Sequence, residues 1–213
     1  MRKEANLIIV GGTIAAGKST LVDGLANRRG FFPVPELREN DKVQEIILEK
    51  LYEGTRIHNA TIQYYFIANR YRQYKEECGG LVTSILDRGI WEDWFFALLL
   101  MESEPNSYQH FIELWKSTLK KILDLYGYPK AYIYVKVDWE SFKERIFNRN
   151  REAEIRNFSE NESYFKRLLV EYLDNFENLL EEWDIKPIVI DTTKLNEKEV
   201  VDFAIKELEK IGV

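Results

Sequence analysis

Residues 12–19 constrain the fold of this 213-residue chain more than any other segment. Their sequence, GTIAAGKS, fits the phosphate-loop pattern G-x-x-x-x-G-K-[ST]. The apolar run at residues 7–10 predicts a buried strand before the loop, and the apolar spacing over residues 18–27 predicts a helix after it. Glycines let a backbone wrap closely around phosphates, and the N–H groups of the loop and of the helix N-terminus would face the anion. The alternative is a glycine-rich turn that only opens a helix.

The pattern also assigns roles to individual side chains of this segment. Lys18 would reach the β- and γ-phosphates of a nucleotide, and the Ser19 hydroxyl would bind Mg²⁺. We expect nucleotide contacts along the whole loop and into the following helix, from Gly12, Thr13, Ile14, Ala15, Ala16, Gly17, Lys18, Ser19 and Thr20.

Composition narrows the class of protein. The length suits one domain, or one domain with a helical lid. The formal net charge of −6 does not suggest a nucleic-acid-binding surface, although a local basic patch stays possible. The longest apolar run, residues 94–101, is too short to span a bilayer, and Glu4 does not fit a signal peptide. With Cys78 as the single cysteine, we expect a cytoplasmic protein that binds neither nucleic acid nor membrane.

Predicted strands and helices alternate along the chain. This order predicts a parallel sheet covered by helices on both faces, with ligands at the carboxyl ends of the strands. The strands are expected at residues 7–10, 31–35, 81–86, 131–137 and 187–190. The helices are expected at residues 18–27, 41–52, 57–77, 91–102, 107–125, 139–148, 162–182 and 197–210.

Charged residues follow the second and third predicted strands. Glu36 comes after the second strand, and Asp87 and Arg88 come after the third. Because parallel strands end at the same edge of a sheet, these residues should lie around the phosphate loop. Asp87 could hold Mg²⁺ or its water, and Glu36 could accept a proton from an attacking hydroxyl. Alternatively, each carboxylate only caps the next helix.

Two further clusters suggest a ligand site. In the helix at residues 57–77, Gln63 and Arg70 share a stripe with apolar residues, so they must be paired or face a ligand; the alternative is a pair at a surface edge. The other cluster surrounds the end of the helix at residues 139–148, where we expect Asn150 to form a left-handed turn. Its guanidinium groups suit a transferring phosphoryl group, and the alternative is a solvated, charged helix end. This cluster consists of Arg145, Arg149, Arg151 and Glu154.

Taken together, these segments resemble the deoxynucleoside kinases, the family of deoxycytidine, deoxyguanosine and deoxyadenosine kinases. The resemblance covers nearly the whole chain. It includes the loop GTIAAGKST, Val34-Pro35-Glu36, Asp87-Arg88-Gly89 and the arginine-rich segment RIFNRNR at residues 145–151. Gly89 departs from the serine that is usual in the family. Three residues that alone suggest core aromatics or a helix-start carboxylate gain a role through the resemblance: Tyr52, Asp93 and Phe96.

The resemblance implies a P-loop kinase fold in a single domain, residues 1–213, with a lid at about 149–157. It implies transfer of the γ-phosphoryl group of ATP to a deoxynucleoside 5′-hydroxyl by a homodimeric enzyme. Glu36 would be the base, with Lys18, Arg88, Arg149 and Arg151 stabilising charge, Arg145 and Arg149 contacting the nucleotide, and Ser19 and Asp87 holding Mg²⁺. Substrate contacts would come from Tyr52 and Glu154 to the sugar, Gln63, Arg70 and Asp93 to the base edge, Phe96 stacking on the base, and Glu36 and Arg88 at the 5′ end.

Two alternatives remain open from the sequence. A nucleoside monophosphate kinase of the thymidylate kinase type shares the loop and a DR motif, but it would need cations at the acceptor phosphate. A nucleotide switch of the GTPase kind would need an Asn-Lys-x-Asp motif, which does not occur in the chain. The Arg70–Asp93 pair further predicts that deoxyadenosine, deoxyguanosine or deoxycytidine is preferred to thymidine.

Overall fold

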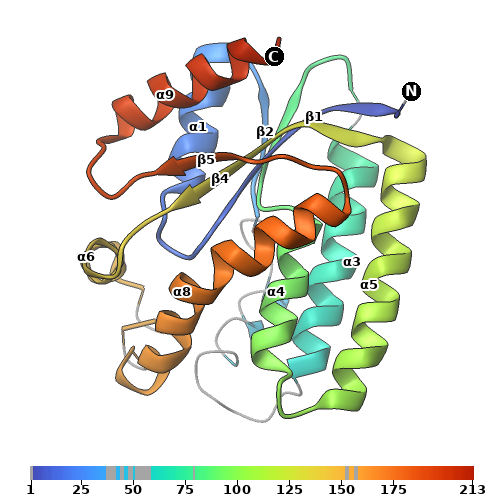
Figure 1. Ribbon diagram of the computed structural model, residues 1–213, viewed down its shortest axis with the longest axis vertical. Coiled ribbons are helices and arrows are strands. Elements are labelled where there is room, and N and C mark those ends of the chain that lie inside the picture. Colours follow the sequence, from blue (N-terminus) through green and yellow to red (C-terminus); the bar gives the residue numbers. More distant parts are fainter. Residues whose placement is uncertain are drawn as a thin grey trace.

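Five parallel strands form a single sheet in the order β2-β3-β1-β4-β5 (Figure 1). The computed structural model describes residues 2–36, 42–43, 46–47, 50, 59–78, 80–151, 154–155 and 158–213. This sheet confirms the predicted P-loop kinase fold. The strands are β1 (Glu4–Gly12), β2 (Phe32–Val34), β3 (Ser84–Asp87), β4 (Tyr128–Lys136) and β5 (Ile188–Asp191).

The sheet is buried on both faces, because successive residues of its central strands enter two different apolar clusters. In β1, Leu7 and Ile9 join one cluster, whereas Ile8 and Val10 join the other. Such continuous apolar runs are typical of parallel strands covered by helices on both sides. The helices are α1 (Lys18–Arg29), α3 (Asn59–Glu77), α4 (Ile90–Leu100), α5 (Pro105–Tyr126), α6 (Trp139–Arg149), α8 (Phe158–Glu182) and α9 (Glu197–Lys210).

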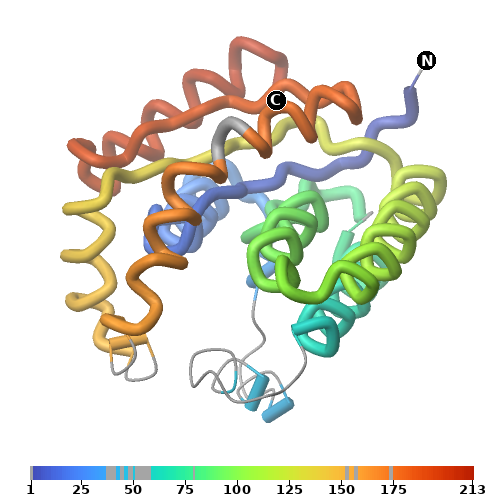
Figure 2. Tube along the Cα trace, turned by 60° about the horizontal axis from the view of Figure 1, so that its bottom comes forward, coloured from blue at the N-terminus to red at the C-terminus, as the bar shows by residue number. Residues whose placement is uncertain are grey.

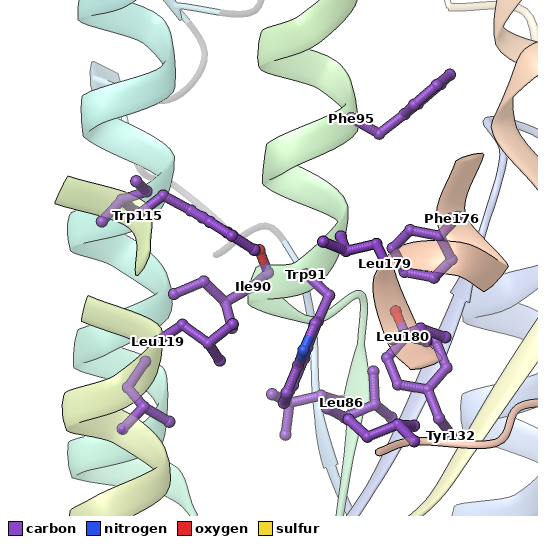
Figure 3. Packing of buried hydrophobic residues seen from close by; sticks show 14 of the residues in the cluster. Leu86, Ile90, Trp91, Phe95, Trp115, Leu119, Tyr132, Phe176, Leu179 and Leu180 are labelled. Carbon is purple, nitrogen blue, oxygen red and sulfur yellow. The ribbon is translucent and has the colours of Figure 1, made fainter. Parts of the chain in front are cut away.

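Helices α1, α6 and α9 pack on one side of the sheet, and α3, α4 and α5 pack on the other. Helix α8 contributes to both clusters. Figure 3 shows how α4 is held between α5 and α8: Ile90 lies near Trp115, while Trp91 points toward Leu86 and Tyr132. Trp115 Nε1 donates to the Ile90 carbonyl at 2.7 Å, so the start of α4, which carries site residues, is fixed by a buried hydrogen bond.

Several element boundaries differ from the predicted ones. The third strand begins at Ser84 and not at residue 81, because Leu81 and Val82 are exposed and sheet pairing starts at Ser84. The fourth strand begins three residues earlier than predicted, since Tyr128 pairs with Glu4. The helix predicted at residues 41–52 lies mostly outside the described residues. Across the described part of the chain, every helix is too short or too polar to cross a membrane.

All five strands point the same way, so their carboxyl ends gather the loops that carry the predicted site residues. Figure 2 shows α6 and α8 on one side of this edge, and α3 and α4 on the other. The site therefore lies between two groups of helices that the sheet holds in place.

Candidate active site

The phosphate loop joins β1 directly to α1. A Cβ atom on Gly12 would lie 2.1 Å from the Val135 carbonyl oxygen, so β4 leaves no room for a side chain here. Gly17 has φ = 95°, a left-handed conformation that favours glycine, and it caps the N-terminus of α1. Lys18 is buried, and its Nζ donates to the Thr13 carbonyl at 2.9 Å. Burial, with the charge of a neighbouring arginine, lowers the Lys18 pKa to about 8.

A hydroxyl and a carboxylate meet beside this loop. Asp87 ends β3 next to Val10 of β1, and the Ser19 Oγ donates to its Oδ2 at 2.5 Å. The other carboxylate oxygen, Oδ1, is buried and has no hydrogen-bond partner among the described residues. Burial raises the pKa of Asp87, with Lys18 and the Ser19 hydrogen bond acting in the opposite direction. An orphaned buried oxygen beside a hydroxyl is a donor set that suits Mg²⁺.

Glu36 lies between two buried arginines. Its Oε1 is 2.5 Å from Arg88 Nε and accepts a hydrogen bond from Arg70 Nη2 at 3.2 Å. Partial burial opposes its ionisation, but the charges of Arg88, Arg70 and Lys18 outweigh this effect and lower the Glu36 pKa to about 2. The carboxylate is therefore ionised throughout the physiological pH range.

A second ion pair lies deeper, between α3 and α4. Arg70 is fully buried, and its Nε is 3.5 Å from Asp93 Oδ2, too far for a good hydrogen bond. Neither atom has a hydrogen-bond partner among the described residues, and the same holds for Gln63 Oε1. Burial raises the Asp93 pKa to about 7, against the opposing charges of Arg70 and Arg88. Buried polar groups left unpaired in this way are suited to bind a polar ligand.

The predicted lid segment starts at the end of α6. Asn150 has φ = 53°, which confirms the expected left-handed turn. Arg149 donates a hydrogen bond to Glu154, and Arg151 Nη1 lies 3.7 Å from its other oxygen. Glu154 is only 3% exposed, so the turn brings both arginines to a buried carboxylate.

A single cavity of about 590 Å³ joins these groups. That volume is within the range of small-molecule sites. Among its lining residues are many of the predicted site residues: Ile14, Ala15, Lys18, Ser19, Glu36, Gln63, Arg70, Asp87, Arg88, Asp93, Phe96, Arg149, Arg151 and Glu154. The Phe96 ring is half-buried, and the Arg88 guanidinium lies 4.6 Å from its centre. Tyr52 lies outside the described residues.

Arg145 contacts the phosphate loop from α6 and is not among the residues that line the cavity. Its guanidinium donates to the Thr192 hydroxyl at 2.9 Å and to the Thr192 carbonyl at 2.7 Å, and more weakly to the Ala15 carbonyl at 3.4 Å. Arg145 thus supports the loop backbone, and its contact with a nucleotide stays a prediction. Five loop residues also lie outside the cavity lining: Gly12, Thr13, Ala16, Gly17 and Thr20.

Two polar residues that were not predicted, Asp23 and Tyr164, also line the cavity, and two others support the site from outside its lining. Gln73 accepts from Arg70 at 3.3 Å and donates to the Pro35 carbonyl at 2.8 Å, so it links α3 to the segment that carries Glu36. Its position one turn after Arg70 was an available signal. The other is Glu92, a fully buried carboxylate whose sequence position indicates only a helix start.

Gly89 has a packing reason in this chain. A Cβ at this position would lie 2.9 Å from Ile9 Cγ2, so β1 fills the space that a serine would need. Glycine replaces the usual serine at position 89 because Ile9 of the neighbouring strand β1 occupies the space that a side chain would need.

Comparisons with known proteins agree with this geometry. Residues 8–211 match the family model described as deoxynucleoside kinase. An uncharacterized protein of Mycoplasma pneumoniae is 34% identical over 195 residues, which cover 90% of this chain and 85% of the relative. The deoxyadenosine/deoxycytidine kinase of Bacillus subtilis is 32% identical over 174 residues, 78% of this chain and 75% of the relative. The structure of deoxyadenosine kinase from M. mycoides with bound dCTP has a TM-score of 0.75 at 22% identity, covering 96% of this chain and 99% of that one.

Proposed function

This chain belongs to the deoxynucleoside kinase family, and on that basis we propose that it transfers the γ-phosphoryl group of ATP to the 5′-hydroxyl of a deoxynucleoside. One observation carries the proposal. The same cavity joins a phosphate loop, a carboxylate held ionised by two arginines, and a buried set of unpaired polar groups. These parts correspond to a phosphate donor site, a base for a hydroxyl, and a site for a nucleobase.

The donor side fits ATP and Mg²⁺. Lys18 would lie against the phosphates, whose negative charge would favour its protonated form against the burial that lowers its pKa. The Ser19 hydroxyl and the orphaned Asp87 Oδ1, directly or through water, would hold Mg²⁺. The bound metal would neutralise charge on the phosphates.

The acceptor side centres on Glu36. With a pKa of about 2 it is a weak base, but it is always ionised and can orient the 5′-hydroxyl by accepting its hydrogen bond. Phosphoryl transfer passes through a loose transition state, so little basicity is needed before the bond to phosphorus forms. The proton then passes from the hydroxyl oxygen to Glu36. Arg88, in contact with Glu36, would stabilise the charge on the phosphoryl oxygens.

The nucleobase would complete the unpaired set between α3 and α4. Arg70 offers only donors, and ionised Asp93 offers only acceptors. A base edge with an acceptor beside an exocyclic amino group satisfies both, as in adenine, guanine and cytosine, whereas thymine has no amino group. We therefore infer a preference for deoxyadenosine, deoxyguanosine or deoxycytidine over thymidine. The Bacillus subtilis relative is a deoxyadenosine/deoxycytidine kinase, which accords with this preference.

Other contacts complete the proposed substrate complex. Glu154 would bind the sugar 3′-hydroxyl, while Arg149 and Arg151, now paired with Glu154, would turn toward the phosphates. Phe96 would stack on the base, and Tyr52 would contact the sugar.

A single activity panel tests the proposal. Purified protein with ATP and Mg²⁺ is incubated with each of the four deoxynucleosides and, separately, with each of the four monophosphates. ADP formation and the nucleotide products are then measured by chromatography. We expect deoxynucleosides to be converted to monophosphates, with thymidine slowest, and Lys18→Ala to abolish the reaction. Turnover of monophosphates alone would overturn the proposal in favour of a monophosphate kinase.

We also propose that the enzyme is a homodimer. A groove of about 570 Å³ lies between α3 and α5, and the large side chains of Tyr64 and Leu114 lie in it 36% and 44% exposed. A second copy that covers this groove would remove apolar surface from water. Light scattering should give twice the 25.3 kDa chain mass, and Leu114→Glu should give the single-chain mass. A parent protein that scatters as a single chain would contradict this proposal.

A further inference from the structure

Glu92 connects segments of the site that are far apart in sequence. It lies in the first turn of α4 and is fully buried. Its Oε2 accepts a hydrogen bond from the Gly89 N–H at 3.2 Å. Its Oε1 accepts from the Gly12 N–H of the phosphate loop at 2.8 Å, from Arg88 Nη1 at 3.1 Å, and from the Tyr172 hydroxyl of α8.

A helix-capping role explains only one of these bonds. A first-turn glutamate that reaches back to the N-cap N–H uses one oxygen and normally stays in water. Here the second oxygen binds donors from the end of β1, the residue after β3, and α8. Burying a carboxylate carries a desolvation penalty. Apolar side chains could hold these three segments together without that penalty, so structural support alone does not explain a buried glutamate here.

Arg88 is the residue most dependent on this carboxylate. Its φ of 73° is a left-handed conformation that is unfavourable for a residue with a side chain. Glu92 holds Arg88 Nη1, and Glu36 lies against Nε on the neighbouring edge of the same guanidinium. A planar group held at two edges has a fixed orientation. The orientation of Arg88 toward the phosphates and toward Glu36 therefore depends on Glu92.

We propose that Glu92 is a positioning residue for phosphoryl transfer, which fixes the first amide of the phosphate loop and the Arg88 guanidinium relative to each other. Donor phosphates and the base Glu36 then share one rigid frame. This inference rests on the proposed function, since it assigns Glu92 a part in that reaction without contact to the substrates.

The test compares Glu92→Gln with a matched control. Glutamine keeps the side-chain length but removes the charge, and its amide N–H group must face a donor in either orientation: the Gly89 N–H, or the Gly12 N–H and Arg88. We expect kcat, normalised to nucleotide-binding sites counted by calorimetry, to fall about 10- to 100-fold, the range that small misplacements of reacting groups produce. The KM values for ATP and nucleoside should change less than about threefold, because the side chains that bind them remain.

The control is Glu199→Gln. Glu199 occupies the same capping position in α9, where its carboxylate accepts from the Asn196 N–H, but it is exposed and remote from the cavity. This variant loses the same charge at the same capping position, where the amide oxygen of glutamine can still accept the capping bond. We expect its kcat to equal that of the parent.

A pH profile separates positioning from loss of structure. Burial is the main cause of the raised Asp93 pKa, and the charge of Glu92 raises it further, while Arg70 and Arg88 lower it and Glu36 adds a smaller increase. Removing the Glu92 charge should therefore move the acid limb of kcat/KM for the nucleoside to lower pH. A purely structural defect would lower the amount of active protein and leave the limb in place.

The outcomes are distinguishable. If the parent phosphorylates no deoxynucleoside, the proposed function fails. If the parent is active and Glu92→Gln keeps kcat per site within about twofold, or if Glu199→Gln loses as much, only the positioning role is overturned. If Glu92→Gln fails to fold, the Tyr172→Phe variant tests the positioning role in its place. It removes the hydroxyl that donates to Glu92 Oε1 and keeps the aromatic ring. It should lower kcat about threefold, and an unchanged kcat would refute the role.

Discussion

Replacing Asp93 by asparagine should abolish a pH dependence that the buried Arg70–Asp93 pair builds into substrate recognition. Asp93 is 3% exposed, and burial raises its pKa to about 7 although Arg70 lies 3.5 Å away. The ionised carboxylate accepts hydrogen bonds at both oxygens, whereas the protonated carboxyl keeps one acceptor oxygen and turns the other into an O–H donor. Protonation therefore weakens the match to Arg70 and to the amino group of a base, which are all donors. Near neutral pH the free enzyme is then a mixture of a form that binds the base well and a form that binds it poorly.

The size of the effect follows from the pKa. A carboxyl with a pKa near 7 is roughly 90% ionised at pH 8 and roughly 10% ionised at pH 6. Because kcat/KM reports ionisations of the free enzyme, it should fall by up to about tenfold for each pH unit below 7. In Asp93→Asn the side chain keeps its shape and does not titrate, so the profile should be lower overall and flat over this range.

The assay is kcat/KM for the best deoxynucleoside between pH 5.5 and 8.5, at saturating ATP and Mg²⁺. Protonation of ATP or of other site groups would affect both proteins equally, so the variant corrects for it. An acid limb that persists unchanged in Asp93→Asn would refute the reasoning. A parent profile that is flat across the range would do the same.

The same pKa makes a prediction for stability. Since the folded-state pKa of Asp93 is above its unfolded value of 3.8, its favourable contribution is complete below pH 3.8 and is lost as the pH rises through 7. Asp93→Asn does not carry this loss. Its free energy of unfolding should exceed that of the parent at pH 8, by an amount on the order of a few kcal/mol. In urea titrations the advantage should disappear at pH 4, and an advantage independent of pH would contradict it.

Three other variants probe separate parts of the site. Glu36→Gln keeps the shape but removes the carboxylate, so kcat at saturating substrates should fall about 10²- to 10⁴-fold, and near-normal turnover would exclude Glu36 as the base. Arg149→Ala should lower kcat more than it weakens nucleoside binding in calorimetry. Arg167→Ala should change neither, because Arg167 is a half-buried arginine of α8 that is paired with Glu102 and Glu171 outside the site. Gly89→Ser would place a Cβ atom 2.9 Å from Ile9 Cγ2 and should reduce the free energy of unfolding by about 1–3 kcal/mol. Urea unfolding measures this change, and an unchanged urea midpoint would contradict it.

Much of the fold could be predicted because it depends on local patterns. The phosphate loop requires backbone conformations that Gly12 and Gly17 adopt readily, and those residues are visible in the sequence. The left-handed turn at Asn150 follows from the same local preference. Alternating apolar strands and helices predict a parallel sheet, and a parallel sheet gathers strand ends at one edge. Glu36 and Asp87 were placed at the site by this reasoning.

The remaining site contacts depend on which segments pack together. No local signal indicates that Gln73 reaches back to the segment after β2, or that Arg145 supports the loop backbone through Thr192. Some predicted ends of strands were wrong for the same reason, because pairing with a neighbouring strand decides where a strand begins. Leu81 is as apolar as a strand residue, but it lies beyond the point where β3 finds its neighbours and is exposed.

Glu92 and Glu199 show where sequence stops and tertiary structure decides. Both follow an N-cap residue by three positions, and both accept a hydrogen bond from its N–H. The sequence by itself determines that each starts a helix. Glu199 remains in water, whereas α8 and the phosphate loop cover Glu92 and replace its water with donors from Gly12, Arg88 and Tyr172. The physical reason is that capping needs only neighbouring backbone, while burial of a charge is set by distant segments that meet through folding.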